Sequence, residues 1–165
     1  MRFAIIRSRF NGEITQALLD GAMRGFADEH IGEELVDRFD VPGSFELPLA
    51  ALWAAQSKRY NAIVCVGCVV RGDTPHFEYV AGEAARGIAD VARATGVPVI
   101  FGVLTTDTLD QARSRAASDA AGGADHSAPP GDAGAGRAVA VQRSNKGYEA
   151  ARSAVAMAQL RRKFD

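Results

Sequence analysis

The chain has little of several features that would narrow its function at once: it has two cysteines, three histidines, almost no net charge and no long hydrophobic run. Its 19 basic and 20 acidic residues are interspersed, so no basic stripe is available for nucleic acid or an anionic membrane. No apolar run approaches the roughly 20 residues that span a bilayer, and the first residues begin a strand pattern instead of a signal peptide. With 165 residues, 47% of them apolar, we expect one cytoplasmic domain over residues 1–165, with neither nucleic acid nor membrane as a partner.

The two cysteines, Cys65 and Cys68, have the spacing of a redox or zinc motif. They fall within an apolar run that is typical of a strand, and residues three apart on a strand point to opposite faces. The two thiols can therefore form neither an easy disulfide nor a shared metal site. None of His30, His76 and His126 has a second ligand at a recognised spacing, so no metal is expected.

Apolar runs and helical periodicities alternate from the beginning of the chain. The pattern predicts strands at residues 3–8, 34–39, 62–70 and 97–105. It predicts helices at residues 14–26, 47–57, 76–92, 109–115 and 144–163, the first of them capped by Asn11. Because the third and fourth strands are almost entirely apolar, they are expected to be buried on both faces. The sequence therefore predicts an α/β fold, a three-layer αβα sandwich around a four-stranded parallel sheet.

Residues 116–136 differ from the rest of the chain, because they consist mostly of Ala, Gly, Pro, Ser and Asp and contain no large apolar side chain. Such a segment cannot bury enough surface to order itself strongly. We expect a flexible Ala/Gly/Pro-rich insertion at about 116–143, and we interpret His126 within it as a solvated loop residue.

The segment Arg-Gly-Asp-Thr-Pro-His-Phe, at residues 71–77, directly follows the apolar third strand. In open α/β sheets, ligands bind at the carboxyl ends of the strands. Asp73 and Thr74 precede a predicted helix start, where backbone N–H groups and the helix dipole favour an anion such as phosphate. His76 would lie beside that anion and could exchange protons near neutral pH. The alternative is that His76 only packs or hydrogen-bonds at the start of the helix.

The other strand ends carry residues that suit a planar ligand. Phe10 follows the first strand and could stack on a heterocycle. The backbone around Ser44 and Glu46, after the second strand, could pair with the polar rim of that ring. Each residue also has a simpler interpretation, since Phe10 could belong to the core and Glu46 could stabilise a first helical turn.

Taken together, these segments resemble the 6,7-dimethyl-8-ribityllumazine synthase family. The matching segments are SRFN at 8–11, VPGSFELP at 41–48, RGDTPHF at 71–77, GVPVIFGVLTTD at 96–107 and NKG at 145–147. The resemblance implies a flavodoxin-like fold and a riboflavin-biosynthesis transferase. That enzyme joins 5-amino-6-(D-ribitylamino)uracil to 3,4-dihydroxy-2-butanone 4-phosphate, and it releases phosphate and water without a metal or organic cofactor.

The resemblance also implies roles for individual residues. His76 would transfer protons, and Arg115 would clamp the phosphate. The substrate-binding residues would be Phe10, Ser44, Phe45, Glu46, Cys68, Val69, Val70, Asp73, Thr74, Phe101, Arg115 and Lys146. The residues that resemble those reaching the pocket from a neighbouring subunit are Phe101, Arg115 and Lys146.

Two features bear on assembly. Relatives connect the position of Arg115 to the Asn-Lys-Gly motif through a short turn, whereas this chain has a much longer segment there. The chain also begins directly at the first strand, without the additional amino-terminal strand of many relatives. Both features favour a homopentamer over a sixty-subunit shell.

Two other functions remain open at this stage. A non-catalytic flavin- or lumazine-binding protein could use the same pocket, and a purely structural assembly protein would need no pocket. The joint presence of His76, Arg115 and Lys146 favours the enzyme over both.

Overall fold

The structure, a computed structural model, describes residues 1–117 and 145–164. Most of the expected insertion, including His126, lies outside the described residues. The elements in chain order are β1 (Phe3–Ser8), α1 (Gly12–Asp28), β2 (Val36–Val41), α2 (Leu47–Gln56), β3 (Ala62–Val70), α3 (His76–Thr95), β4 (Val99–Thr106), α4 (Leu109–Ala116) and α5 (Lys146–Arg161). Within the described ranges, the expected strands and helices are therefore all present.

Several element boundaries differ from the predicted ones by a few residues, and two of these shifts have a clear local reason. β2 begins later than predicted, because Glu33–Leu35 forms a 3-10 turn closed by a hydrogen bond from Leu35 N to Gly32 O. β4 also begins later, at Val99. α5 begins at Lys146 because the side chain of Asn145 caps it.

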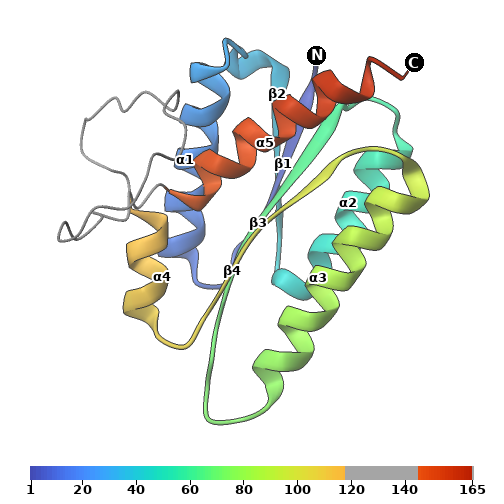
Figure 1. Ribbon diagram of the computed structural model, residues 1–165. Helices are drawn as coiled ribbons and strands as arrows, with labels where there is room; N and C mark the ends of the chain where they lie inside the picture. The colour runs from blue at the N-terminus through green and yellow to red at the C-terminus, as the bar shows by residue number, and fades with distance from the viewer. Residues whose placement is uncertain (118–144, 165) are drawn as a thin grey trace, which may run out of the picture.

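The four strands form one parallel sheet in the order β2-β1-β3-β4. This order corresponds to the first four positions of the flavodoxin-like sheet. Helices α1, α4 and α5 cover one face of the sheet, and α2 and α3 cover the other (Figure 1). The predicted three-layer αβα sandwich is therefore confirmed.

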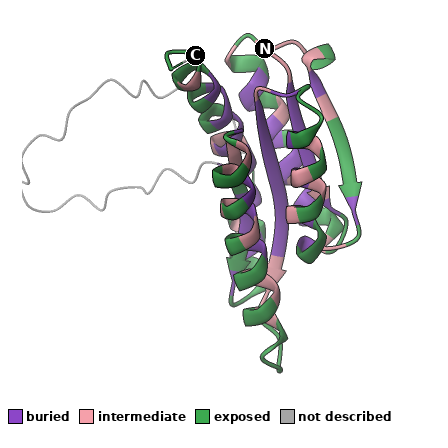
Figure 2. Cartoon of the chain, turned by 90° about the vertical axis from the view of Figure 1, so that its right-hand side faces the viewer, coloured by how far each residue is buried: buried purple, intermediate pink, exposed green. Residues whose placement is uncertain are grey.

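The core consists of two apolar clusters, one on each face of the sheet. One cluster joins the sheet to α1 and α5, and the other joins it to α2 and α3. Figure 2 shows the buried residues concentrated in the strands and on the helix faces turned toward them. Among the described helices, none is long and apolar enough to cross a membrane.

Cys65 and Cys68 lie on opposite faces of β3, in different core clusters. Both are free thiols, as the strand periodicity predicts. Burial raises the pKa of Cys65 to about 12 and that of Cys68 to about 11, so both thiols stay protonated at neutral pH. The described residues contain no group of three or more His, Cys, Asp or Glu side chains that could hold a metal ion.

Asn11 stands at the N-cap position of α1, as predicted, and its carbonyl accepts from Ile14 N and Thr15 N, but its side chain does not take part in the cap. The residue adopts a left-handed conformation with φ 55°. Its Nδ2 instead donates to the carbonyl of Cys68 over 2.9 Å. Asn11 therefore ties the loop after β1 to the carboxyl end of β3, which a side-chain cap would not do.

Candidate active site

The loops that follow the four strands meet at one edge of the sheet, as the parallel topology requires (Figure 1). Backbone hydrogen bonds of 2.9 Å tie neighbouring loops together, from Arg9 N to Val41 O and from Arg71 N to Thr106 O. The Asn11 side chain adds a further tie to β3. The sequence motifs that follow the strands are thus brought together.

Two aromatic rings stand exposed at this edge. Phe10 is 69% exposed, so the alternative that it belongs to the core is wrong. Phe45 is 57% exposed and lies in the 3-10 turn Ser44–Glu46 that precedes α2. Glu46 is also exposed. An exposed phenyl ring has apolar surface to bury, which suits stacking against a planar ligand or contact with another chain.

Ser44 is only 4% exposed, and its hydroxyl has no hydrogen-bond partner within the described part of the chain. The hydroxyl lies over Gly67 of β3, where a Cβ atom would come within 2.6 Å of it. The hydroxyl of Ser8, at the end of β1, is buried and unpartnered in the same way. A buried hydroxyl without a partner costs about 1–3 kcal/mol, so both serines gain if a ligand or water reaches them.

The loop between β3 and α3 leads into a helix start that no side chain caps. Asp73 and Thr74 are exposed directly before that helix. The N–H groups of the first turn are therefore free of a competing side-chain acceptor. His76 is the first residue of α3, and it is exposed. In the single chain, this exposure does not support the alternative that His76 packs at the helix start.

Arg71 is a residue that the sequence analysis did not assign to the site, and it anchors this loop. Its Nε donates to Asp107 Oδ1 over 2.9 Å, and its Nη1 lies 3.4 Å from Glu78 Oε1. Its guanidinium carbon also lies 4.6 Å from the centre of the Phe77 ring. Arg71 thus ties the start of α3 to the end of β4. No sequence signal separates such an arginine from an ordinary surface charge.

A second group of predicted residues lines a cavity of about 270 Å³ between β4, α4 and α5. Phe101, Arg115 and Lys146 are brought together there, although they are far apart in sequence. The ring of Phe101 is 42% exposed on β4, one of the two edge strands of the sheet. No residue of the loops that directly follow β1, β2 and β3 lines this cavity.

Glu149 is a cavity residue that the sequence analysis missed. Its Oε2 lies 2.6 Å from Lys146 Nζ, one turn earlier on α5. This ion pair is about half exposed, so it is weak and can open when an anion competes for the ammonium. The three-residue spacing on a helix is the sequence signal that could have revealed it.

The helical residues of the two groups lie on opposite sides of the sheet, whereas Phe101 shares a face of β4 with Val99 and Val103 and so faces the side of α2 and α3. Ser44 and His76 belong to the side of α2 and α3, and Arg115 and Lys146 belong to the side of α4 and α5 (Figure 1). The Cys68 side chain is buried in the core, so only its main chain reaches the edge, whereas Val69 and Val70 are half-buried at the end of β3. Within one chain, the structure does not bring the two groups together around one cavity.

One comparison with known proteins bears on this site. A family model described as 6,7-dimethyl-8-ribityllumazine synthase matches residues 1–162. The match covers both groups of residues.

Proposed function

The chain belongs to the 6,7-dimethyl-8-ribityllumazine synthase family, and from this we propose that its two groups of site residues complete one active site across a boundary between subunits. The protein is a transferase of riboflavin biosynthesis that acts on small-molecule substrates, and the binding-protein alternative is not favoured. The observation that carries the proposal is that Ser44 and His76 lie on the side of α2 and α3, whereas the cavity with Arg115 and Lys146 is lined only by β4, α4 and α5.

The phosphate of 3,4-dihydroxy-2-butanone 4-phosphate would bind before α3. Backbone N–H groups around Asp73 and Thr74 would donate to it, aided by the uncapped helix start. Arg115 of a neighbouring subunit would add a two-pronged guanidinium contact, and Lys146 would add a second positive charge. The cavity that holds both cations opens beside β4, one of the two edge strands of the described sheet.

The ribitylaminouracil would bind against the ends of β1 and β3. Phe10 would stack on its ring, with Phe101 contributed by the neighbouring subunit. Ser44, Phe45 and Glu46 would line the ring and the ribityl chain. The main chain of Cys68 and the half-buried Val69 and Val70 would complete that wall.

His76 would move protons between the two substrates. The uracil amine adds to the butanone carbonyl and forms an imine with loss of water. Removal of a carbon-bound proton then helps to expel phosphate, and the ribityl-bearing nitrogen closes the ring with loss of water. The exposed imidazole beside the phosphate loop is positioned to accept and return these protons. Much of the remaining rate gain would come from holding both substrates together.

Family membership implies a homo-oligomer, and within it we propose a homopentamer. The supporting feature is the long segment between α4 and α5, which we interpret as an insertion within a single domain. We also propose a cytoplasmic location, on the composition alone. Native mass spectrometry would decide the assembly, since a pentamer and a sixty-subunit shell differ twelvefold in mass.

The proposed role of His76 is tested by mixing protein with both substrates and following lumazine fluorescence and phosphate release. His76→Ala should lower kcat by roughly a hundred- to ten-thousandfold and leave the affinity for the pyrimidine unchanged. His30→Asn is the matched control. His30 is exposed, lies just after the carboxyl end of α1 and away from the candidate site, and has a φ of 60° that suits Asn. Unchanged turnover in His76→Ala would refute the proton-transfer role. No product from the wild-type protein, despite tight pyrimidine binding, would favour a binding protein.

A further inference from the structure

The side chain of Asn145 is buried at the junction of three helices. It is 4% exposed and lies between α1, the end of α4 and the start of α5. Both halves of its amide are hydrogen-bonded, with four bonds to residues that the structure describes. A buried amide that is satisfied in this way holds its neighbours in one arrangement.

The oxygen of the Asn145 amide begins α5. Oδ1 accepts from Gly147 N over 2.8 Å and from Tyr148 N over 3.1 Å, which is the pattern of a helix cap. Lys146 is therefore the first residue of α5, and its direction is set by this cap.

The nitrogen of the same amide closes α4. Nδ2 donates to Ala116 O over 2.5 Å and to Ala17 O over 3.0 Å. Ala116 is the last residue of α4, and its carbonyl belongs to the group that a helix leaves without an internal partner. Arg115 directly precedes it. One side chain thus fixes the backbone next to both cations of the cavity.

Two glycines make room for this junction. A Cβ atom on Gly21 would collide with Asn145 Oδ1, and a Cβ atom on Gly147 would collide with the carbonyl of Leu18. The close approach of α5 to α1 therefore depends on the missing side chains, and it places Asn145 within reach of Ala17 and Ala116.

We propose that Asn145 is a positioning residue that holds Arg115 and Lys146 in register for the phosphate of the substrate; this rests on the phosphate role proposed above for those two residues. α4 has only eight residues and is too short to be stable alone, so its last turn depends on an external partner. Without the donor bond to Ala116, that turn opens and the backbone that carries Arg115 beside the cavity loses its fixed position. If the amide only capped α5, it would hold the backbone at Lys146 but would not hold the end of α4, where Arg115 lies.

The two halves of the amide can be tested separately. Asn145→Asp keeps an oxygen that caps α5, but it replaces the donor to Ala116 and Ala17 by a second acceptor. We expect the KM for the butanone phosphate to rise about ten- to a hundredfold, while the KM for the pyrimidine stays within about twofold. Asn145→Ser, which also caps a helix but is too short to bridge to α4, should show the same split if the Asp variant does not fold.

The comparison variants are Arg115→Ala and Tyr148→Phe. Arg115→Ala should reproduce the selective rise in KM for the phosphate substrate. Tyr148→Phe removes a 2.8 Å hydrogen bond from α5 to Asp28 of α1 and leaves Asn145 in place, so it should not change either KM. Steady-state kinetics gives both KM values for every variant, and thermal unfolding shows which variants are folded.

The outcomes separate this inference from the proposed function. If Arg115→Ala raises the KM for the phosphate substrate while the foldable Asn145 variants do not, the inference is overturned and the site stands. Equal changes in both KM values for the Asn145 variants would indicate general distortion and would also overturn it. A normal KM in Arg115→Ala would overturn the proposed phosphate site and the inference together.

Discussion

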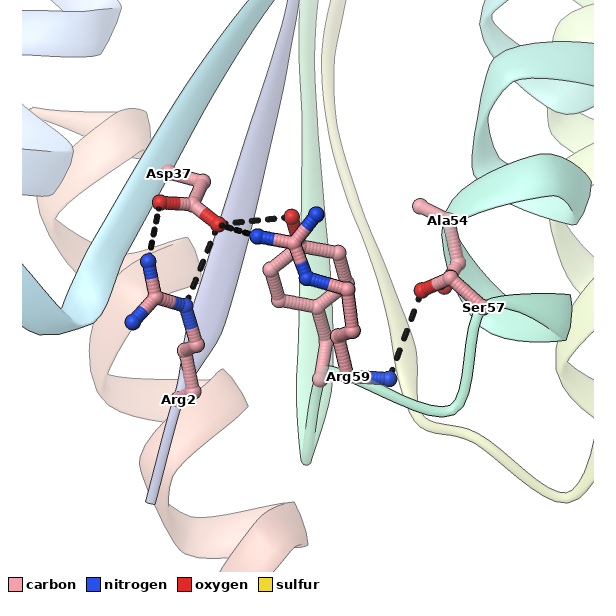
Figure 3. Close-up of polar contacts among 6 residues, drawn as sticks. Arg2, Asp37, Ala54, Ser57 and Arg59 are labelled. Atoms are coloured by element: carbon pink, nitrogen blue, oxygen red, sulfur yellow. Dashed lines mark hydrogen bonds and ion pairs between the residues drawn. The ribbon is translucent and has the colours of Figure 1, made fainter.

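Asp37, at the residue scale, carries the densest set of polar contacts at the edge of the sheet opposite the candidate site (Figure 3). Its carboxylate accepts from Arg2 Nη2 over 2.7 Å and Nε over 3.1 Å, from the Tyr60 hydroxyl over 2.7 Å and from Arg59 Nη2 over 3.2 Å. These partners come from the starts of β1 and β3, so Asp37 of β2 holds three strands together at their amino ends.

The hydrogen bond from Arg2 is the main reason that the pKa of Asp37 lies below its ordinary value of 3.8, and the Tyr60 hydroxyl adds to it. A carboxyl group whose pKa is depressed by folding stabilises the protein above its unfolded pKa. That stabilisation is lost as the pH falls through the lower, folded value.

Asp37→Asn should therefore destabilise the protein at pH 7 by about 1 kcal/mol, because the pairs are partly exposed and three donors lose a charged acceptor. The difference from wild type should shrink as the pH falls below 3.8 toward the folded pKa. Urea unfolding at pH 7 and at pH 3 measures it. A difference that stays constant with pH would show that the ionised carboxylate is not responsible.

At the scale of elements, the contact between α1 and α5 sets the position of α5, which lines one side of the cavity that holds Arg115 and Lys146. Gly147 and Gly25 lie where the two helices approach closely, and a Cβ atom on either would meet backbone of the other helix. Tyr148 and Arg152 add a hydrogen bond and an ion pair from α5 to the end of α1. The two glycines set the distance between the helices, and the polar contacts lie at the exposed border of the helix–helix contact.

Gly147→Ala should destabilise the protein by about 3 kcal/mol, because the new methyl group collides with a rigid carbonyl of Leu18. Gly82→Ala in α3 is the matched control. A Cβ atom there meets nothing within 4 Å in the single chain, so the same substitution should stabilise α3 by up to about 1 kcal/mol. Thermal and urea unfolding compare the two. Equal changes in stability in both variants would mean that helix propensity, and not the close approach of α5 to α1, determines the effect of Gly147→Ala.

For the whole molecule, the sheet separates His76 from the cavity of Arg115 and Lys146, and the proposed active site therefore calls for a second subunit. His76, the proposed proton-transfer residue, and the proposed phosphate loop lie on the side of α2 and α3, and the cavity with Arg115 and Lys146 lies on the side of α4 and α5. The edge strand β4 carries Phe101 and runs beside that cavity. An arrangement of copies that places one chain's β4 edge against another's strand-end loops would complete every site at once.

The segment 118–144 should be replaceable by a linker of about six residues, because the hydrogen bond from Asn145 to Ala116 already holds its two ends together. We expect unchanged KM values and a gain in stability of roughly 1 kcal/mol, since a shorter loop costs less entropy to close. Kinetics and thermal unfolding test this. A folded variant with little activity would show that the segment takes part in catalysis or assembly.

Much of the fold could be predicted because buried strands have a strong local signal. β1 and β3 begin and end at the predicted residues, since their apolar runs are bounded by polar ones. β2 was misplaced because it is an exposed edge strand preceded by a 3-10 turn, so its apolar pattern is weak. The role of the Asn11 side chain was missed for a different reason, since its partner Cys68 is 57 residues away.

The sequence by itself determined the alternation of strands and helices, the edge of the sheet where the loops meet, and the residue types that suit a phosphate and a planar ring. These properties follow from local periodicity and from the direction of parallel strands. Only the tertiary structure decided that His76 and Arg115 lie on opposite sides of the sheet and that Asn145 joins three helices. The reason is physical: burial leaves a repeating pattern along the chain, whereas a hydrogen bond between distant residues depends on where the fold places both partners.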